Sequence, residues 1–207
     1  LKDSGLVSAA FSRFATSKLI QSKVYEMKAV SPSGLTFMLN SKKPFAYILK
    51  REVFSRFLRS RARGSAELRY ETARKISYSK NGVGVETENG TYEGKMIIGA
   101  DGTLSAVRRN LGIKLPSMYP GIFARAEKKL GTDTIEVYLN KFFSPDFFSW
   151  IIPQTKEYGI ITRIRPRNNF EYFKKKLNLP DGRMYSSYIP IGYCKSYAQR
   201  TLLVGDA

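Results

Sequence analysis

Two short motifs in this chain place an aspartate beside a glycine directly after a predicted strand. The first is Gly99-Ala100-Asp101-Gly102, behind residues 95–98, and the second is Gly205-Asp206, behind the apolar residues 202–204. An aspartate in this position lies at the carboxyl edge of a sheet, where its oxygens can accept hydrogen bonds from sugar hydroxyls. A glycine beside it leaves the backbone free to turn without a side chain in the way. The motifs therefore predict a ligand site at one edge of a sheet.

The residues after Asp101 add positive charge to this site. A helix is predicted over residues 104–111, closed by Gly112, and its N-terminus would offer backbone amides and the positive end of the helix dipole to a diphosphate. Arg108 adds a fixed charge on the same helix. The plainer alternative is a hairpin turn, and a lone Gly-Asp turn is common. We favour a cofactor site because the two motifs occur in order, and a shared cofactor requires their strands to lie side by side.

The amino-acid composition limits other chemistry. The chain has no histidine and one cysteine, Cys194, so an internal disulfide framework is excluded and the commonest general base and metal ligand is absent. No metal site is predicted, and the chemistry must come from a cofactor. The net charge of +18 favours polyanionic partners, which are nucleic acid, an anionic membrane surface or phosphate-bearing ligands. No apolar run approaches the roughly 20 residues that span a bilayer, and no signal-peptide pattern occurs, so we expect a cytoplasmic protein.

The hydrophobic pattern predicts the elements that position these motifs. Residues 51–62 predict an amphipathic helix with a basic outer face, ended by Gly64. Residues 24–30, 35–39 and 45–49 predict an antiparallel meander. Residues 68–78, 83–88 and 91–93 predict strands joined by the turns Asn81-Gly82 and Asn89-Gly90. A second sheet is predicted from residues 121–127, 134–139, 147–152 and 159–164, followed by a helix over 169–177 and a last strand over 201–204.

Together, the two motifs resemble the Asp-Gly and Gly-Asp fingerprints of flavoproteins with the para-hydroxybenzoate hydroxylase fold. The segment Tyr47-Ile48-Leu49-Lys50-Arg51-Glu52-Val53-Phe54 resembles the strand, arginine and helix step of that family. The resemblance implies an FAD cofactor, with Gly205 and Asp206 at its ribityl chain and with Asp101, Gly102 and Arg108 near its diphosphate. It also implies that Arg51 approaches the FAD backbone. Taken alone, Arg51 would be one more solvated arginine on a basic helix.

A narrower resemblance concerns the substrate. Phe148-Ser149-Trp150-Ile151-Ile152-Pro153 resembles the Tyr-x-Trp-x-Phe-Pro motif of archaeal and plant geranylgeranyl reductases, with Phe in place of Tyr and Ile in place of Phe. The segment 3–7 resembles a Cys-Ser-Gly-Leu segment of these enzymes, with Asp3 in place of Cys. This resemblance implies reduction of C=C bonds in an isoprenoid lipid by hydride from reduced FAD, with NAD(P)H or ferredoxin as electron donor. Phe148, Trp150 and Pro153 are the predicted substrate contacts, whereas most of the neighbouring aromatic residues fit a sheet core better.

We therefore expect an α+β fold, in which an incomplete α/β-type FAD-binding part joins a substrate domain with a mixed or antiparallel sheet. Residues 1–50 are assigned mostly to substrate-domain strands, 51–113 to the FAD-binding part, 114–198 to the substrate sheet and 199–207 to the start of the Gly-Asp motif. The Gly-x-Gly-x-x-Gly turn is expected before Leu1, and a helix is expected after Ala207. Residues 1–207 alone are expected to bind FAD poorly and to be inactive.

Two other classes of protein stay open. An FAD-dependent monooxygenase or halogenase-like enzyme would share Asp101, Asp206 and Arg51, and only the Trp150 motif separates it. A nucleic-acid-binding module would explain the charge, but the sequence carries no stacking motif or zinc-finger spacing, so no nucleic acid is expected. The basic clusters could instead rest peripherally on an anionic membrane, at about 1 kcal/mol per residue, although a solvated surface is the plainer reading. Their members are Arg56, Arg59, Arg61, Arg63, Lys174, Lys175 and Lys176.

Overall fold

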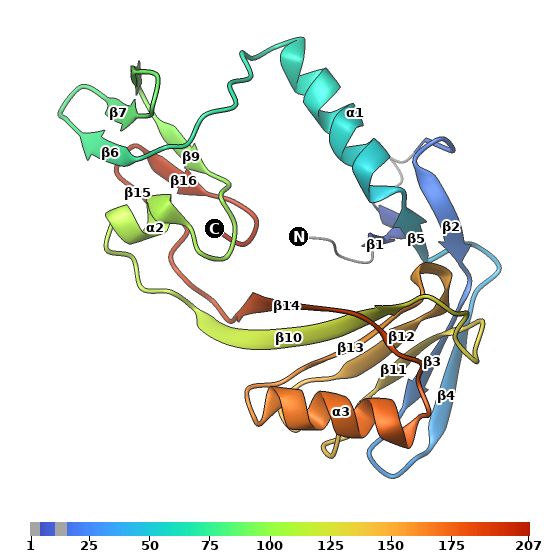
Figure 1. Cartoon of the computed structure of the whole chain (residues 1–207). Coiled ribbons are helices and arrows are strands. Elements are labelled where there is room, and N and C mark those ends of the chain that lie inside the picture. Colours follow the sequence, from blue (N-terminus) through green and yellow to red (C-terminus); the bar gives the residue numbers. More distant parts are fainter. Residues whose placement is uncertain (1–4, 11–15) are drawn as a thin grey trace. The chain divides into compact units, whose positions relative to one another are not determined.

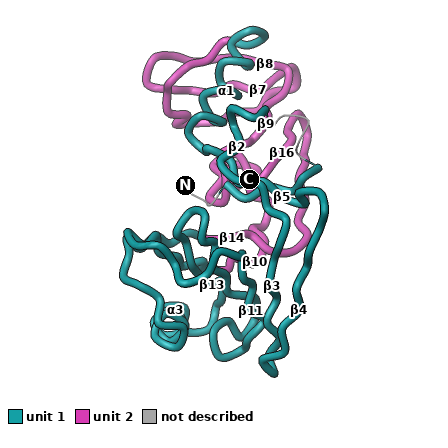
Figure 2. The backbone as a smooth tube through the Cα atoms, turned by 90° about the vertical axis from the view of Figure 1, so that its right-hand side faces the viewer, with its two compact units in different colours: residues 1–66, 120–187 teal, residues 67–119, 188–207 magenta. Residues whose placement is uncertain are grey.

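The computed structural model describes residues 5–10 and 16–207, and the chain separates into two compact units (Figure 2). The first unit comprises Leu1–Ala66 and Pro120–Ser187, and the second comprises Glu67–Tyr119 and Tyr188–Ala207. Strands predominate in the described residues and three α-helices accompany them, so the predicted α+β class is confirmed.

The first unit is built on a seven-stranded sheet with the order β14-β10-β13-β12-β11-β3-β4. Strands β3 and β11 pair in parallel, whereas β10, β13, β12 and β11 pair antiparallel, as do β3 and β4. In chain order the strands are β3 (Glu26–Val30), β4 (Thr36–Asn40), β10 (Ser117–Ala126), β11 (Ile135–Tyr138), β12 (Ser149–Ile152), β13 (Glu157–Ile161) and β14 (Gly182–Ile191). The predicted second sheet is thus confirmed, and β14 is a strand that the sequence reading missed.

Helix α3 (Pro166–Lys176) covers one face of this sheet (Figure 1). Pro166 suits the first helical position because its missing N–H would have no partner there. Phe170 and Phe173 are fully buried against Tyr158 and Ile160 of β13, and their cluster is the main core of the unit. The three lysines of the last turn lie at the negative end of the helix dipole, as helix C-termini prefer.

A smaller sheet of the first unit corrects the predicted meander. Residues 24–30 are divided at Tyr25 between β2 (Ile20–Val24) and β3, and β5 (Ala46–Leu49) pairs with β1 (Leu6–Ser8) and β2 instead of with β4. The reason is burial: Val24, Ala46 and Ile48 pack with Ile135 and Ile152 of the large sheet, so β5 stacks on that sheet instead of extending it.

Helix α1 (Arg51–Arg63) follows β5 directly, and Gly64 is its C-cap, as predicted. Its buried residue Phe54 packs against Leu19 and Leu49, and the partly buried Val53 and Phe57 join the same cluster. This packing places α1 in the first compact unit with the N-terminal strands, whereas the sequence analysis grouped residues 51–113. The division into cofactor and substrate parts stays a prediction.

The second unit contains two three-stranded sheets. Strands β6 (Lys75–Tyr78), β7 (Val83–Glu86) and β8 (Thr91–Gly94) form an antiparallel meander through the two predicted Asn-Gly turns. The strand predicted over 68–78 begins only at Lys75. The other sheet has the order β15-β16-β9, with β9 (Ile97–Gly99), β15 (Tyr197–Ala198) and β16 (Thr201–Leu203), and the short helix α2 (Ala106–Asn110) packs beside it.

Candidate functional site

The two Asp motifs lie at the same sheet edge within the second unit. Strand β16 pairs with β9 in parallel, with Leu203 opposite Gly99, and the amide of Val204 donates to the carbonyl oxygen of Gly99 at 2.9 Å. Because the strands are parallel neighbours, the turns that carry Asp101 and Asp206 leave the sheet at the same end (Figure 1). The adjacency that a shared cofactor requires is therefore confirmed.

The carboxylate of Asp101 is held by the start of α2. One oxygen accepts hydrogen bonds from the amides of Ala106 at 2.6 Å and Val107 at 3.3 Å, and the Ser105 hydroxyl accepts from the amide of Arg108 at 3.0 Å. Burial opposes ionisation of Asp101, but the hydrogen bonds from Ser105 and from the backbone amides outweigh it and lower the pKa. Asp101 is thus an ionised carboxylate with a fixed direction.

These contacts correct the predicted role of the helix. Helix α2 has five residues instead of the eight expected, and Asp101 and Ser105 already accept from its first amides. The helix N-terminus therefore caps itself and has few amides to offer a diphosphate. Helix α2 contributes more clearly by packing closely against β9 and β16. A Cβ on Gly99 would lie 2.7 Å from Leu203 Cδ2 and 2.9 Å from Val107 Cβ, so only glycine permits this close approach.

The buried side chain of Arg108 links the Asp-Gly turn to the Gly-Asp turn. Its side chain is buried, and its two terminal nitrogens donate to the carbonyl oxygens of Lys195 at 3.0 Å and Ala207 at 2.5 Å. The guanidinium thus fixes the end of the Gly-Asp turn to α2. Its predicted proximity to a diphosphate stays a prediction.

The turn glycines leave open backbone beside both carboxylates. Gly102 has φ +79° and Gly205 has φ +66°, a region that side chains disfavour, and among the described residues no heavy atom other than those of the chain neighbours lies within 4 Å of where a Cβ would be on either glycine. Asp206 is exposed. The edge thus presents two carboxylates and two uncovered turns, a donor and acceptor set that suits a ligand with hydroxyl and phosphate groups.

The predicted substrate residues lie in the first unit. Trp150 on β12 pairs across the sheet with Gly159, and a Cβ on Gly159 would lie 2.5 Å from Trp150 Cζ2, so the indole rests on bare backbone. Its Nε1 donates to Glu157 Oε1 at 3.2 Å. Phe148 is in edge contact with the indole, with ring centroids 6.1 Å apart, whereas Pro153 is buried at the start of a short 3₁₀ turn.

Most of the nearby aromatic residues were predicted to lie in a sheet core, but only two of the four do, because Phe142 and Phe147 are exposed. Tyr138 and Phe143 are buried in the core beneath α3, where both contact Phe173. Phe142 is 67% exposed, and Phe147 stacks on Phe148 with ring centroids 4.8 Å apart. Phe148 and Trp150 are both partly exposed, so they remain available to a ligand.

Arg51 is the first residue of α1 and lines a groove of about 1100 Å³ within the first unit. The groove also takes in Arg125 of β10 and Lys156 of the turn before β13, which the sequence analysis did not single out. No local sequence signal could have identified these two residues as part of a groove. The pairing of β10 with β13 places Arg125 opposite Glu157, which is next to Lys156, and this pairing is not visible in the sequence.

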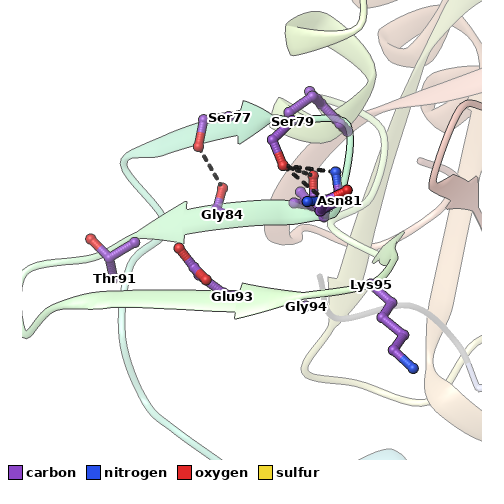
Figure 3. A pocket seen from close by; sticks show the side chains of 11 residues that line it. Ser77, Ser79, Asn81, Gly84, Thr91, Glu93, Gly94 and Lys95 are labelled. Carbon is purple, nitrogen blue, oxygen red and sulfur yellow. Dashed lines mark hydrogen bonds between the residues drawn. The ribbon is translucent and has the colours of Figure 1, made fainter.

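Figure 3 shows a smaller pocket of about 380 Å³ on the meander of the second unit. The Ser79 hydroxyl in this pocket accepts hydrogen bonds from the amides of Asn81 and Gly82, so it stabilises the turn between β6 and β7. None of the predicted site residues lines it.

Within residues 5–10 and 16–207, no helix is long and apolar enough to cross a membrane. No group of three or more metal-ligating side chains occurs in the same described ranges. Asp3, the departure from the Cys-Ser-Gly-Leu segment, lies outside the described residues.

Comparisons with known proteins agree with this geometry. No protein-family model matches the chain. The chloroplastic geranylgeranyl diphosphate reductase of Oryza sativa is 30% identical over 70% of this chain and 36% of its own length. The digeranylgeranylglycerophospholipid reductase of Methanococcus vannielii is 24% identical over 93% of this chain and 56% of its own length. The chain thus spans between about one third and a little over half of these relatives.

Solved structures share the fold. A geranylgeranyl bacteriochlorophyll reductase-like protein from Thermoplasma acidophilum superimposes with a TM-score of 0.84 at 19% identity, over all of this chain and 61% of that one. The flavin-dependent brominase Bmp2 gives a TM-score of 0.67 at 12% identity, over 96% of this chain and 60% of that one.

Proposed function

Since this chain is a homologue of the geranylgeranyl reductases, we propose that the protein is an FAD-dependent oxidoreductase that reduces C=C bonds of a geranylgeranyl or related isoprenoid lipid. The observation that carries the proposal is the parallel pairing of β9 with β16, which brings the Asp101 and Asp206 turns to one edge. The residues present fit FAD in their chemistry, since carboxylates suit ribityl hydroxyls and uncovered turns allow a close approach.

When bound, reduced FAD supplies the hydride, and a proton from solvent or protein completes the saturation of the double bond. The residues of this chain would bind the FAD and orient it. Asp206 would hold the ribityl chain, Asp101 would lie near the diphosphate, and Arg108 would act as a positioning residue that keeps the two turns together. Arg51 is proposed as a further contact of the FAD backbone.

The apolar substrate would lie on the sheet face that carries Trp150 and Phe148. A prenyl chain has no charged group near its reacting double bonds, so it needs apolar surface that excludes water more than it needs a nucleophile. The partly exposed indole, resting on Gly159, supplies such a surface.

Two finer points belong to the same proposal. NAD(P)H or ferredoxin would re-reduce the flavin. The enzyme would work in the cytoplasm, where the basic residues of α1 and α3 could contact an anionic membrane surface. A monooxygenase or halogenase-like activity is the second candidate, since a brominase shares the fold, but the Trp150 motif favours the reductase.

The test is product analysis with the full-length protein. The protein is incubated with FAD, a chemical reductant and geranylgeranyl diphosphate, and the lipid is examined by mass spectrometry. We expect a gain of two hydrogen atoms for each reduced double bond. A lipid that gains oxygen or halogen in the presence of air and halide would favour the second candidate, and an unchanged lipid would contradict the reduction of geranylgeranyl diphosphate.

A further inference from the structure

The groove beside α1 is strongly basic. Among the described residues that line it, Glu52 is the single acidic one. Its cationic side chains are those of Lys50, Arg51, Arg56, Arg59, Arg125 and Lys156. Such a concentration of one sign of charge attracts a multiply charged anion, and arginine is well suited to phosphate because its planar guanidinium can donate two parallel hydrogen bonds.

The walls of the groove are held in place by hydrogen bonds. Arg56 and Arg59 are three residues apart on α1, so they lie on one face of the helix. Elsewhere in the lining, Gln21 of β2 donates to the carbonyl oxygen of Gln154 at 3.1 Å, and Lys156 Nζ donates to the carbonyl oxygen of Glu127 at 2.8 Å. The groove is therefore a built cavity, and at about 1100 Å³ it can take a phosphate-bearing headgroup.

A hydrogen-bonded chain connects this groove with the predicted substrate face. Arg125, which lines the groove, forms an ion pair with Glu157 through Nε and Oε2 at 3.3 Å. The other oxygen of the same carboxylate accepts from Trp150 Nε1 at 3.2 Å. Glu157 is only 3% exposed, so a single buried carboxylate holds both the groove wall and the indole. All of these residues belong to the first unit.

We propose that the groove binds the phosphate end of the isoprenoid lipid while the prenyl chain runs from it across Trp150. The inference rests on the proposed function and deepens it, because it assigns the two ends of one amphiphilic substrate to two joined surfaces. The charged end meets cations, and the apolar end meets the aromatic side chains. Nucleotide phosphates share the same chemistry, and the experiment separates the two sources.

The experiment compares two ligands with the same C20 chain, geranylgeranyl diphosphate and geranylgeraniol, in equilibrium titrations of the full-length protein. The test variant is Arg56→Gln with Arg59→Gln. The matched control is Arg61→Gln with Arg63→Gln, which removes the same charge from the same helix but outside the groove. Arg51 is left unchanged, and the flavin content of each variant is measured, so a loss of cofactor cannot pass for a loss of lipid binding.

We expect the test variant to bind the diphosphate at least about tenfold more weakly and to bind geranylgeraniol as before, because it loses two guanidinium groups that donate charge-assisted hydrogen bonds to phosphate and geranylgeraniol has no phosphate. The control should keep both affinities. Unchanged diphosphate binding in the test variant, or an equal loss for both ligands, would overturn the proposal.

A third ligand, the 2′-phosphate derivative of ADP-ribose, distinguishes the nucleotide source. If the test variant loses this ligand and keeps geranylgeranyl diphosphate, the groove serves a nucleotide and the lipid proposal is wrong. The proposed function and the groove proposal can fail independently. A protein that reduces no isoprenoid contradicts the proposed function. A protein that reduces isoprenoids equally well with and without a phosphate contradicts only the groove proposal.

Discussion

The guanidinium of Arg108 donates a hydrogen bond to the carbonyl oxygen of Ala207, 99 residues further along the chain. Arg108 stands on the helix that follows the Asp-Gly turn, and Ala207 ends the Gly-Asp turn. A buried arginine thus links two motifs that the sequence presents separately, and it does so next to the parallel pairing of β9 with β16.

Replacing this arginine should therefore loosen both turns. Arg108→Met removes the hydrogen bonds to Lys195 and Ala207 and leaves the backbone oxygen of the buried Ala207 without this donor, so we expect a loss of about 1–3 kcal/mol in the free energy of unfolding. Flavin content should fall with it. Denaturant unfolding measures the first effect and absorbance the second. The neighbouring exposed Arg109→Met is the control, and equal stability of the two variants would contradict the structural role.

Gly99 should tolerate no side chain. Gly99→Ala places a methyl group within 3 Å of Leu203 and Val107, so we expect overpacking that lowers the free energy of unfolding by about 1–3 kcal/mol. Thermal unfolding of the full-length protein measures it. Gly131→Ala is the matched control, because in the described part of the chain no heavy atom beyond the neighbouring residues lies within 4 Å of a Cβ there. A Gly99→Ala protein as stable as the control would show that α2 can move away without cost.

Asp101 should stabilise the fold only while it is ionised. Its folded pKa is lowered, so its contribution is fully present above the unfolded pKa of about 3.9 and is lost as the pH falls through the lower folded value. We expect Asp101→Ala to cost about 1 kcal/mol near pH 7, the usual value of a helix cap, and to cost progressively less as the pH falls below the unfolded pKa. Unfolding measured at several pH values tests this. A cost that grows as the pH is lowered would contradict it.

Trp150 and Asp206 should have separable roles. Trp150→Ala should retain flavin and lower prenyl turnover by about tenfold or more, because the loss of a positioning surface displaces the reacting bond. Asp206→Ala should instead lower flavin occupancy. Flavin absorbance and product formation distinguish the two, and Phe142→Ala, at a side chain 67% exposed, is the control. Equal loss of flavin in both variants would contradict this division of roles.

Several features could be predicted from sequence because their signals are local. The apolar face of residues 51–62 and Gly64 identify helix α1, and the Asn-Gly pairs identify the turns of the meander. The two Asp turns are recognisable in the same way, and the parallel pairing of their strands confirms the adjacency inferred for them.

Other features depend on partners that are distant in sequence. Strand β5 joins β1 and β2 because Ala46 and Ile48 bury against β11 and β12, which no pattern within residues 24–49 reveals. Strand β14 was missed because none of its side chains is buried and Gly182 and Pro190 within it are residues that strands usually avoid. Arg125 and Lys156 become neighbours of α1 only in the folded unit, so the groove could not be predicted at all.

The measurement that tests the central claim most directly is a single-turnover experiment without oxygen. The bound flavin of the full-length protein is reduced anaerobically, geranylgeranyl diphosphate is added, and the absorbance of oxidised flavin is followed. The account predicts that the lipid alone restores the oxidised bands, at a rate that rises with lipid concentration. Flavin that stays reduced until oxygen is admitted, or a protein that carries no flavin, would contradict it.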